Sequence, residues 1–106
     1  MAKPRIKLPE SAKAGEIIEI KTLISHVMET GQRKDADGKT IPRDIINDFT
    51  VKFEGTEVFK ASLQPGISAN PYIAFFMRVP GPGEIEFTWT DDAGKKIVEK
   101  ARLNVV

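Results

Sequence analysis

The strongest constraint in this sequence is the alternation of apolar and polar residues with a period of two. The segment EIEFTWT is the clearest example, because Ile85, Phe87 and Trp89 share one face while glutamate and threonine residues fill the other. Residues 16–24 repeat the pattern, with isoleucines on one face. A period of two is that of a half-buried β-strand, whereas an amphipathic helix has a period of about 3.6 residues. The alternation therefore predicts an all-β protein.

Turn-forming segments separate the predicted strands. Residues 91–94 (DDAG) offer a glycine that can adopt the positive φ of a hairpin turn, and residues 101–105 then alternate again. Residues 49–53 also alternate and lead through a turn at 54–56 into a second predicted hairpin. About seven short strands with such turns are typical of a two-sheet sandwich. The whole chain, residues 1–106, is therefore predicted to be one immunoglobulin-like antiparallel β-sandwich domain.

The chain contains no cysteine and one histidine, His26, which limits the chemistry that it can perform. Without cysteine there is no thiol nucleophile, no iron–sulfur ligation and no thiolate zinc site. A single histidine is too few ligands for tight transition-metal binding, and no G-x-S-x-G or phosphate-binding glycine motif is present. The carboxylates of Asp91 and Asp92 lie in a predicted turn, where we expect them to accept local backbone hydrogen bonds. We therefore expect a protein that is not an enzyme and holds no cofactor or metal.

The balance of charges argues against two classes of partner. A net charge of +1, from 16 basic and 15 acidic side chains, provides no broad field to attract nucleic acid or an anionic membrane. The sequence has no apolar run of about 18 residues, and its first segment, MAKPRIKLPE, lacks the apolar stretch of a secretory signal. If the protein acts outside the cytoplasm, we expect another protein to carry it there.

Residues 26–44 form a long segment with little apolar content. The sequence DADG at 35–38 is typical of a turn, so this segment is predicted to include an extended polar hairpin that projects from one end of the sandwich. Two interpretations stay open, a solvated loop and a docking element for a partner. His26 shares strand parity with Ile24, which predicts a hydrogen-bonded residue at a strand end in preference to a metal ligand.

Residues 72–79 are apolar on both faces of a predicted strand, with Arg78 as the interruption. A strand of a two-layer sandwich should have one solvated face, so either another protein or edge loops of the same domain must cover the second face. An Asn-Pro step precedes the strand and predicts an extended Asn70. This short loop is either a turn without further function or a rim contact, in which Ser68 and Asn70 would hydrogen-bond a partner's backbone. The predicted interface comprises Tyr72, Phe75, Phe76, Met77, Ser68 and Asn70.

Several separated segments of the chain together resemble one protein family. They are RIKLP at residues 5–9, HVMETGQRKD at 26–35, IPRDII at 41–46, GISANPY at 66–72 and FTWTDDAG at 87–94. Through them the chain is similar, from about Arg5 to Val106, to the SoxZ family, the Z subunits of the periplasmic sulfur-oxidation (Sox) carrier complex. Val27 stands where the family pattern has proline.

The resemblance implies a non-catalytic subunit that forms a heterodimer with SoxY. In that family SoxY bears a cysteine on a glycine-rich C-terminal arm, to which sulfur intermediates of thiosulfate oxidation are attached while other Sox enzymes act on them. The resemblance also implies a periplasmic location, reached by export together with the signal-bearing SoxY. Besides the apolar strand, we expect partner docking on the polar segment, at His26, Met28, Glu29, Arg33 and Arg43. The resemblance also implies transient contacts with other Sox enzymes.

Other interpretations stay open at this point. Without the resemblance, the chain is interpreted as an adhesion-type or generic immunoglobulin-like interaction module that pairs with itself or with an unrelated protein. A small redox or metal enzyme of sandwich fold is a third class. A Z-type chain separated from its partner would also be able to form a homodimer through the apolar strand, because exposed strand edges recruit substitutes.

Overall fold

Two antiparallel β-sheets build the protein in the computed structural model, which describes residues 4–64, 67 and 69–106. One sheet has three strands in the order β1-β2-β5, and the other has four in the order β4-β3-β6-β7. The strands within the described residues are β1 (Pro4–Lys7), β2 (Ile17–Ile24), β3 (Ile46–Phe53), β4 (Thr56–Ser62), β5 (Tyr72–Arg78), β6 (Gly83–Asp91) and β7 (Lys96–Leu103).

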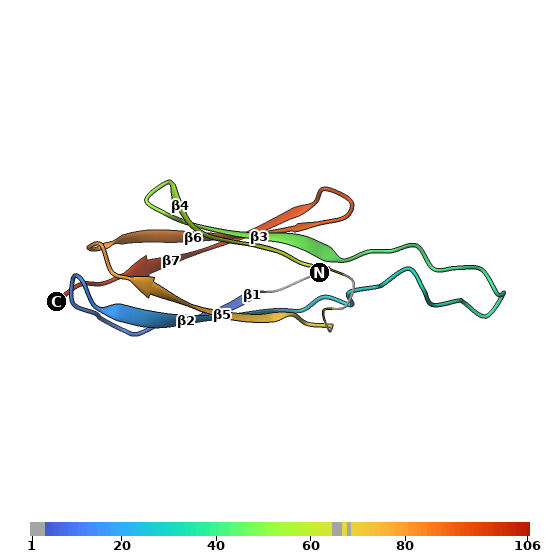
Figure 1. The fold of residues 1–106 in the computed structure, drawn as a ribbon, viewed down its shortest axis with the longest axis horizontal. Helices are drawn as coiled ribbons and strands as arrows, with labels where there is room; N and C mark the ends of the chain where they lie inside the picture. The colour runs from blue at the N-terminus through green and yellow to red at the C-terminus, as the bar shows by residue number, and fades with distance from the viewer. Residues whose placement is uncertain (1–3, 65–66, 68) are drawn as a thin grey trace.

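The two sheets lie face to face as the layers of a sandwich (Figure 1). This arrangement confirms the predicted all-β, immunoglobulin-like sandwich of about seven strands. In the part of the chain that the structure describes, no helix has the length and apolar character needed to cross a membrane.

The core lies between the sheets and is dominated by aromatic rings from both layers. Phe49, Phe87 and Trp89 of the four-stranded sheet are completely or almost completely buried. Phe75 of the three-stranded sheet reaches across to stack on Phe59 of β4, with ring centroids 4.4 Å apart. The inward positions predicted from the period of two in β6 are therefore confirmed.

Both predicted hairpins form. The β6–β7 turn contains Gly94 at a φ of +81°, and the Asp91 Oδ1 atom accepts hydrogen bonds from the backbone N–H groups of Ala93 and Lys95. β3 pairs with β4 in antiparallel register across the turn at residues 54–55. Local turn chemistry therefore specified these connections, as the sequence predicts.

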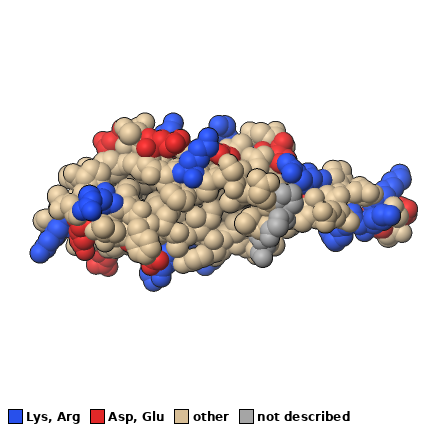
Figure 2. Space-filling model, in the orientation of Figure 1, with Lys and Arg blue, Asp and Glu red and all other residues tan. Residues whose placement is uncertain are grey.

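The segment between β2 and β3 extends beyond the sandwich as a narrow hairpin (Figure 1). Isolated antiparallel bridges join Glu29 to Asp44 and Lys34 to Thr40. At the tip the Asp35 carboxylate accepts the backbone N–H groups of Asp37 and Lys39 and so closes the turn. The predicted polar hairpin is confirmed, and Lys and Arg side chains gather at its far end (Figure 2).

Candidate partner interface

The two faces of β5 differ in burial, because successive side chains of a strand point to opposite sides. Phe75 and Met77 face the core and are buried. Tyr72 and Phe76 point outward, where 59% and 70% of their surfaces are exposed. The prediction of one interface containing all four side chains is therefore corrected, since only Tyr72 and Phe76 are accessible to a partner.

β5 is also an edge strand of its sheet, and the strand between it and β1 is β2. Among the described residues, β2 is the strand with which β5 pairs. An edge strand leaves backbone N–H and C=O groups available for pairing with another chain. Exposed aromatic rings on such a strand combine two features that favour protein association.

Ile17 and Leu23 of β2 extend this apolar surface beyond β5. The register of the β2–β5 pair sets Leu23 opposite Tyr72 and Ile17 opposite Arg78. Ile17 is largely exposed and Leu23 is partly buried. The outer face of the three-stranded sheet therefore carries several apolar side chains, and loops of the described chain do not cover Phe76 or Tyr72.

Asn70 holds the hairpin to the sandwich. Its Oδ1 atom accepts the backbone N–H of His26 at 2.9 Å, and its own N–H donates to the His26 carbonyl at 2.7 Å. Its φ of +54° is left-handed, so the predicted extended geometry is wrong. Asparagine tolerates this conformation, and the two hydrogen bonds to His26 favour it. Asn70 was predicted to hydrogen-bond a partner's backbone, but its amide oxygen is engaged within the chain. Ser68 lies outside the described residues.

His26 lies at the base of the hairpin beside two carboxylates. One ligand atom from each of His26, Asp44 and Asp91 lies within 4.8 Å of the others, which is close enough to consider a metal site. However, the His26 Nδ1 atom accepts the backbone N–H of Met28 at 2.9 Å. Nδ1 must then be unprotonated, so the neutral ring carries its proton on Nε2.

The tautomer of His26 disfavours a metal ion in this cluster. A histidine that binds a metal usually donates its second ring N–H to an oxygen atom. A metal at Nε2 would force the proton onto Nδ1, directly against the Met28 N–H. The His26 Nε2 atom lies 3.9 Å from Asp44 Oδ1, and the His26 side chain is only 10% exposed. The ring is therefore suited to interact with the Asp44 carboxylate. His26 is thus a hydrogen-bonded residue just beyond the end of β2, as predicted.

Met28 anchors the same region from inside. Its side chain is buried in the core, and its Sδ atom accepts the backbone N–H of Ile46 at 3.3 Å. A buried thioether cannot contact a docking protein, so the prediction of Met28 as a docking side chain is corrected. Sequence reasoning missed this because an apolar residue isolated in a polar segment gives no periodic signal.

Glu29 and Arg33 pair with each other along one arm of the hairpin. The Arg33 Nη2 atom lies 2.6 Å from Glu29 Oε1. The hydrogen bond from Arg33 lowers the pKa of the Glu29 carboxyl, and the same bond raises the pKa of the Arg33 guanidinium. Arg33 is well exposed, so of the five predicted docking residues it is the one most accessible to a partner.

Arg43 forms an ion pair with Asp92 in the β6–β7 turn. Its Nε and Nη2 atoms each donate to the Asp92 carboxylate at 2.8 Å. Asp92 also accepts the backbone N–H of Ile45 and the side-chain amide of Asn47. The hydrogen bond from Arg43 is the main cause that lowers the pKa of Asp92. Asp92 therefore fastens the hairpin to the sandwich over a long sequence separation, whereas the sequence predicted only local bonds for it.

The chain matches known proteins at the level of a family and of a fold. A family model described as "Sulphur oxidation protein SoxZ" matches residues 6–102. No curated protein is significantly similar in sequence. Among solved structures, the chain is similar to a superoxide reductase (neelaredoxin) from Ignicoccus hospitalis, with 17% identity, a TM-score of 0.72 and coverage of 97% of this chain and 80% of that one.

Two further solved structures share the architecture. A putative superoxide reductase from Thermotoga maritima has 15% identity and a TM-score of 0.72, and the match covers 97% of this chain and 85% of that one. A hypothetical protein from Pyrococcus horikoshii has 15% identity and a TM-score of 0.61, with 95% and 85% coverage. At such low identity these likenesses establish the fold alone.

Proposed function

This chain belongs to the SoxZ family, and we propose that it is the non-catalytic subunit of a SoxYZ sulfur-carrier complex. In this proposal it binds and stabilises SoxY, whose cysteine carries the sulfur intermediates of thiosulfate oxidation. The complex acts in the periplasm, which this chain reaches by export together with SoxY. The absence of cysteine from the sequence agrees with a subunit that does not itself carry sulfur.

The observation that carries the proposal is the pair of exposed aromatic rings on β5. Tyr72 and Phe76 are mostly exposed on an edge strand. Aromatic side chains are enriched at protein interfaces, where they bury a large area for a small loss of conformational entropy. A partner that covers these rings would also have access to the open backbone edge of β5.

The hairpin between β2 and β3 supports a second role in the complex, contact with the enzymes of the Sox system. It extends away from the sandwich, and its far end carries Lys and Arg side chains (Figure 2). Arg33, Lys34 and Lys39 are exposed there, whereas His26 and Arg43 hold the base. A base held by hydrogen bonds, with a charged tip, is suited to transient, electrostatically guided docking.

Sedimentation of the purified chain with and without SoxY tests the proposal. We expect a 1:1 complex with the wild type, and its loss in Phe76→Asp and Tyr72→Asp. Val98→Asp is the matched control, because Val98 is an exposed apolar residue on β7 of the other sheet. Circular dichroism establishes that each variant remains folded.

The outcomes separate the interface from the assignment of the partner. Failure of the wild-type chain to bind SoxY contradicts the carrier-complex role and leaves a generic immunoglobulin-like interaction module. Binding that survives both aspartate variants retains SoxY as the partner but refutes the β5 face as the interface. Equal loss in Val98→Asp would indicate a general effect of the introduced charge.

A further inference from the structure

The outer face of the three-stranded sheet is basic as well as apolar. The strand registers arrange its side chains in rows, with Arg5 opposite Leu23 and Leu23 opposite Tyr72. In the next row Lys7 lies opposite Lys21. The basic residues of this outer face are Arg5, Lys7, Lys21 and Arg78, and its acidic residue is Glu19.

Lys7 and Lys21 form a pair of like charges directly across the β1–β2 ladder, an arrangement that is destabilising. Glu19 offsets it only in part, since its Oε1 atom lies 3.8 Å from Lys21 Nζ and both side chains are substantially exposed. Among the ion pairs within the described residues, Lys7 and Arg5 take part in none. An added carboxylate between the two lysines would therefore relieve their repulsion.

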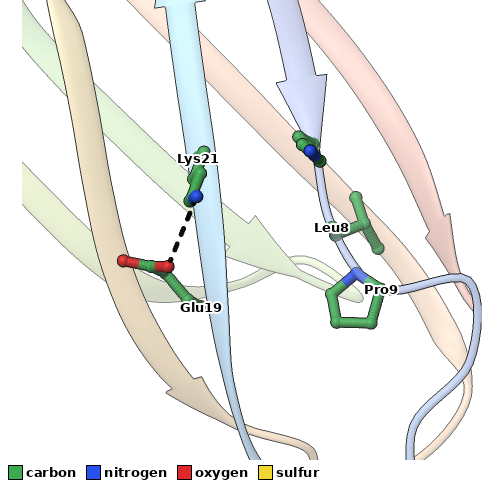
Figure 3. Close-up of a pocket in the computed structure, with 5 residues that line it drawn as sticks. Leu8, Pro9, Glu19 and Lys21 are labelled. Atoms are coloured by element: carbon green, nitrogen blue, oxygen red, sulfur yellow. Dashed lines mark ion pairs between the residues drawn. The ribbon is translucent and has the colours of Figure 1, made fainter.

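Two hollows flank this lysine pair on the same face. One has a volume of about 250 Å³ and includes Arg5, Leu23 and Tyr72 among its lining residues, together with both lysines. The other, of about 220 Å³, is lined by Leu8, Pro9 and Glu19 with the same lysines (Figure 3). Each hollow therefore combines a mostly apolar lining with the side chains of both lysines.

The outer face of the four-stranded sheet has a different character. A hollow on this face has three acidic side chains, three basic side chains and three threonines among its lining residues. The charged residues that line it are Asp48, Glu57, Glu86, Lys52, Lys60 and Lys96. Because both signs of charge are balanced there, this second face has no preference for an acidic partner.

We propose that the outer face of the three-stranded sheet binds an acidic surface of SoxY, with a SoxY carboxylate between Lys7 and Lys21 and an apolar SoxY side chain beside Tyr72. This inference rests on the proposed function and adds the charge of the partner surface. It also predicts that the chain forms a heterodimer in preference to a homodimer. A symmetric homodimer brings the same patch of both copies together, so it would oppose basic residues to basic residues.

Charge reversal on each sheet tests this inference. The variant pair Lys7→Glu and Lys21→Glu, combined in one chain, is compared with Lys52→Glu and Lys60→Glu on the outer face of the other sheet. The affinity for SoxY is measured by calorimetry at about 50 mM and about 300 mM salt. We expect the first double variant to weaken binding at least about tenfold at low salt, the control to change it less than about twofold, and salt to weaken the wild-type complex.

The results distinguish this inference from the function on which it rests. If the wild type binds SoxY and neither the Lys7/Lys21 variant nor salt changes the affinity, the charged interface is refuted and the carrier role stands. If the wild type does not bind SoxY, the charged interface and the carrier role are both refuted. A wild-type homodimer that the Lys7/Lys21 variant abolishes would also overturn the inference, because the face would then accept a second copy.

Discussion

Replacement of Asp92 by alanine tests how the hairpin is fastened to the sandwich. The Asp92 side chain is 16% exposed and accepts hydrogen bonds from Arg43, from the Ile45 backbone and from the Asn47 amide. Asp92→Ala removes all of these acceptors at once. The backbone N–H of Ile45 and the amide of Asn47 then lose their partner at partly buried positions.

The expected cost follows from the exposure of each donor. Arg43 is 47% exposed, so its ion pair contributes about 0.5–1 kcal/mol. The donors from Ile45 and Asn47 are partly buried, and each lost bond to the carboxylate contributes about 1 kcal/mol after partial replacement by water. We therefore expect the free energy of unfolding to fall by about 2–3 kcal/mol. For a domain of this size the melting temperature should fall by about 10 °C or more.

Urea denaturation followed by tryptophan fluorescence measures this change, because Trp89 is the single tryptophan and is buried. Asp37→Ala is the control, since Asp37 is an exposed turn aspartate at the hairpin tip and should change the free energy by less than about 0.5 kcal/mol. If Asp92→Ala is as stable as Asp37→Ala, the hydrogen bonds of Asp92 do not hold the hairpin base and the reasoning is refuted.

Three further predictions concern the core, a close contact and pH. Phe49→Ala should lower the free energy of unfolding by about 3–5 kcal/mol in urea denaturation, because the ring is fully buried; a cost below about 1 kcal/mol would contradict this packing. Gly83→Ala should cost about 1–3 kcal/mol, because its Cβ would lie 2.7 Å from Phe53 Cζ, whereas Gly81→Ala meets nothing within 4 Å and serves as control. The lowered pKa of Asp92 stabilises the fold above the ordinary aspartate pKa, and this contribution is lost as the pH falls through the lowered value. The free energy of unfolding of Asp92→Asn should therefore fall less steeply with decreasing pH than that of the wild type. Parallel curves for the two proteins would refute this contribution of Asp92.

The sequence predicted the strands and hairpins well because their signals are local. The period of two in Ile85, Phe87 and Trp89 identified the buried face of β6, and the turn residues before Gly94 identified the β6–β7 connection. The polar composition of residues 26–44 predicted a projecting hairpin. In each case neighbouring residues alone carry the information, so no knowledge of the remaining chain is needed.

The candidate interface was predicted less well. Alternate side chains of residues 72–78 point to opposite faces, but the sequence does not indicate which of the two faces meets the core. The sequence indicated that this strand is apolar on both sides, and the sandwich decided that Phe75 faces inward and Phe76 outward. Asn70 was expected to be extended, and its bonds to His26 instead hold it in a left-handed conformation.

Composition and local pattern by themselves determined an all-β sandwich without cysteine chemistry, and the segments that resemble the SoxZ family identified its family. Only the tertiary structure decided which distant side chains meet: Asp92 with Arg43, His26 with Asp44, and Lys7 with Lys21. Such pairs depend on strand order and register, which arise when the two sheets pack around a common core. A period of two specifies which side of a strand is apolar, but it carries no information about the strand that lies beside it.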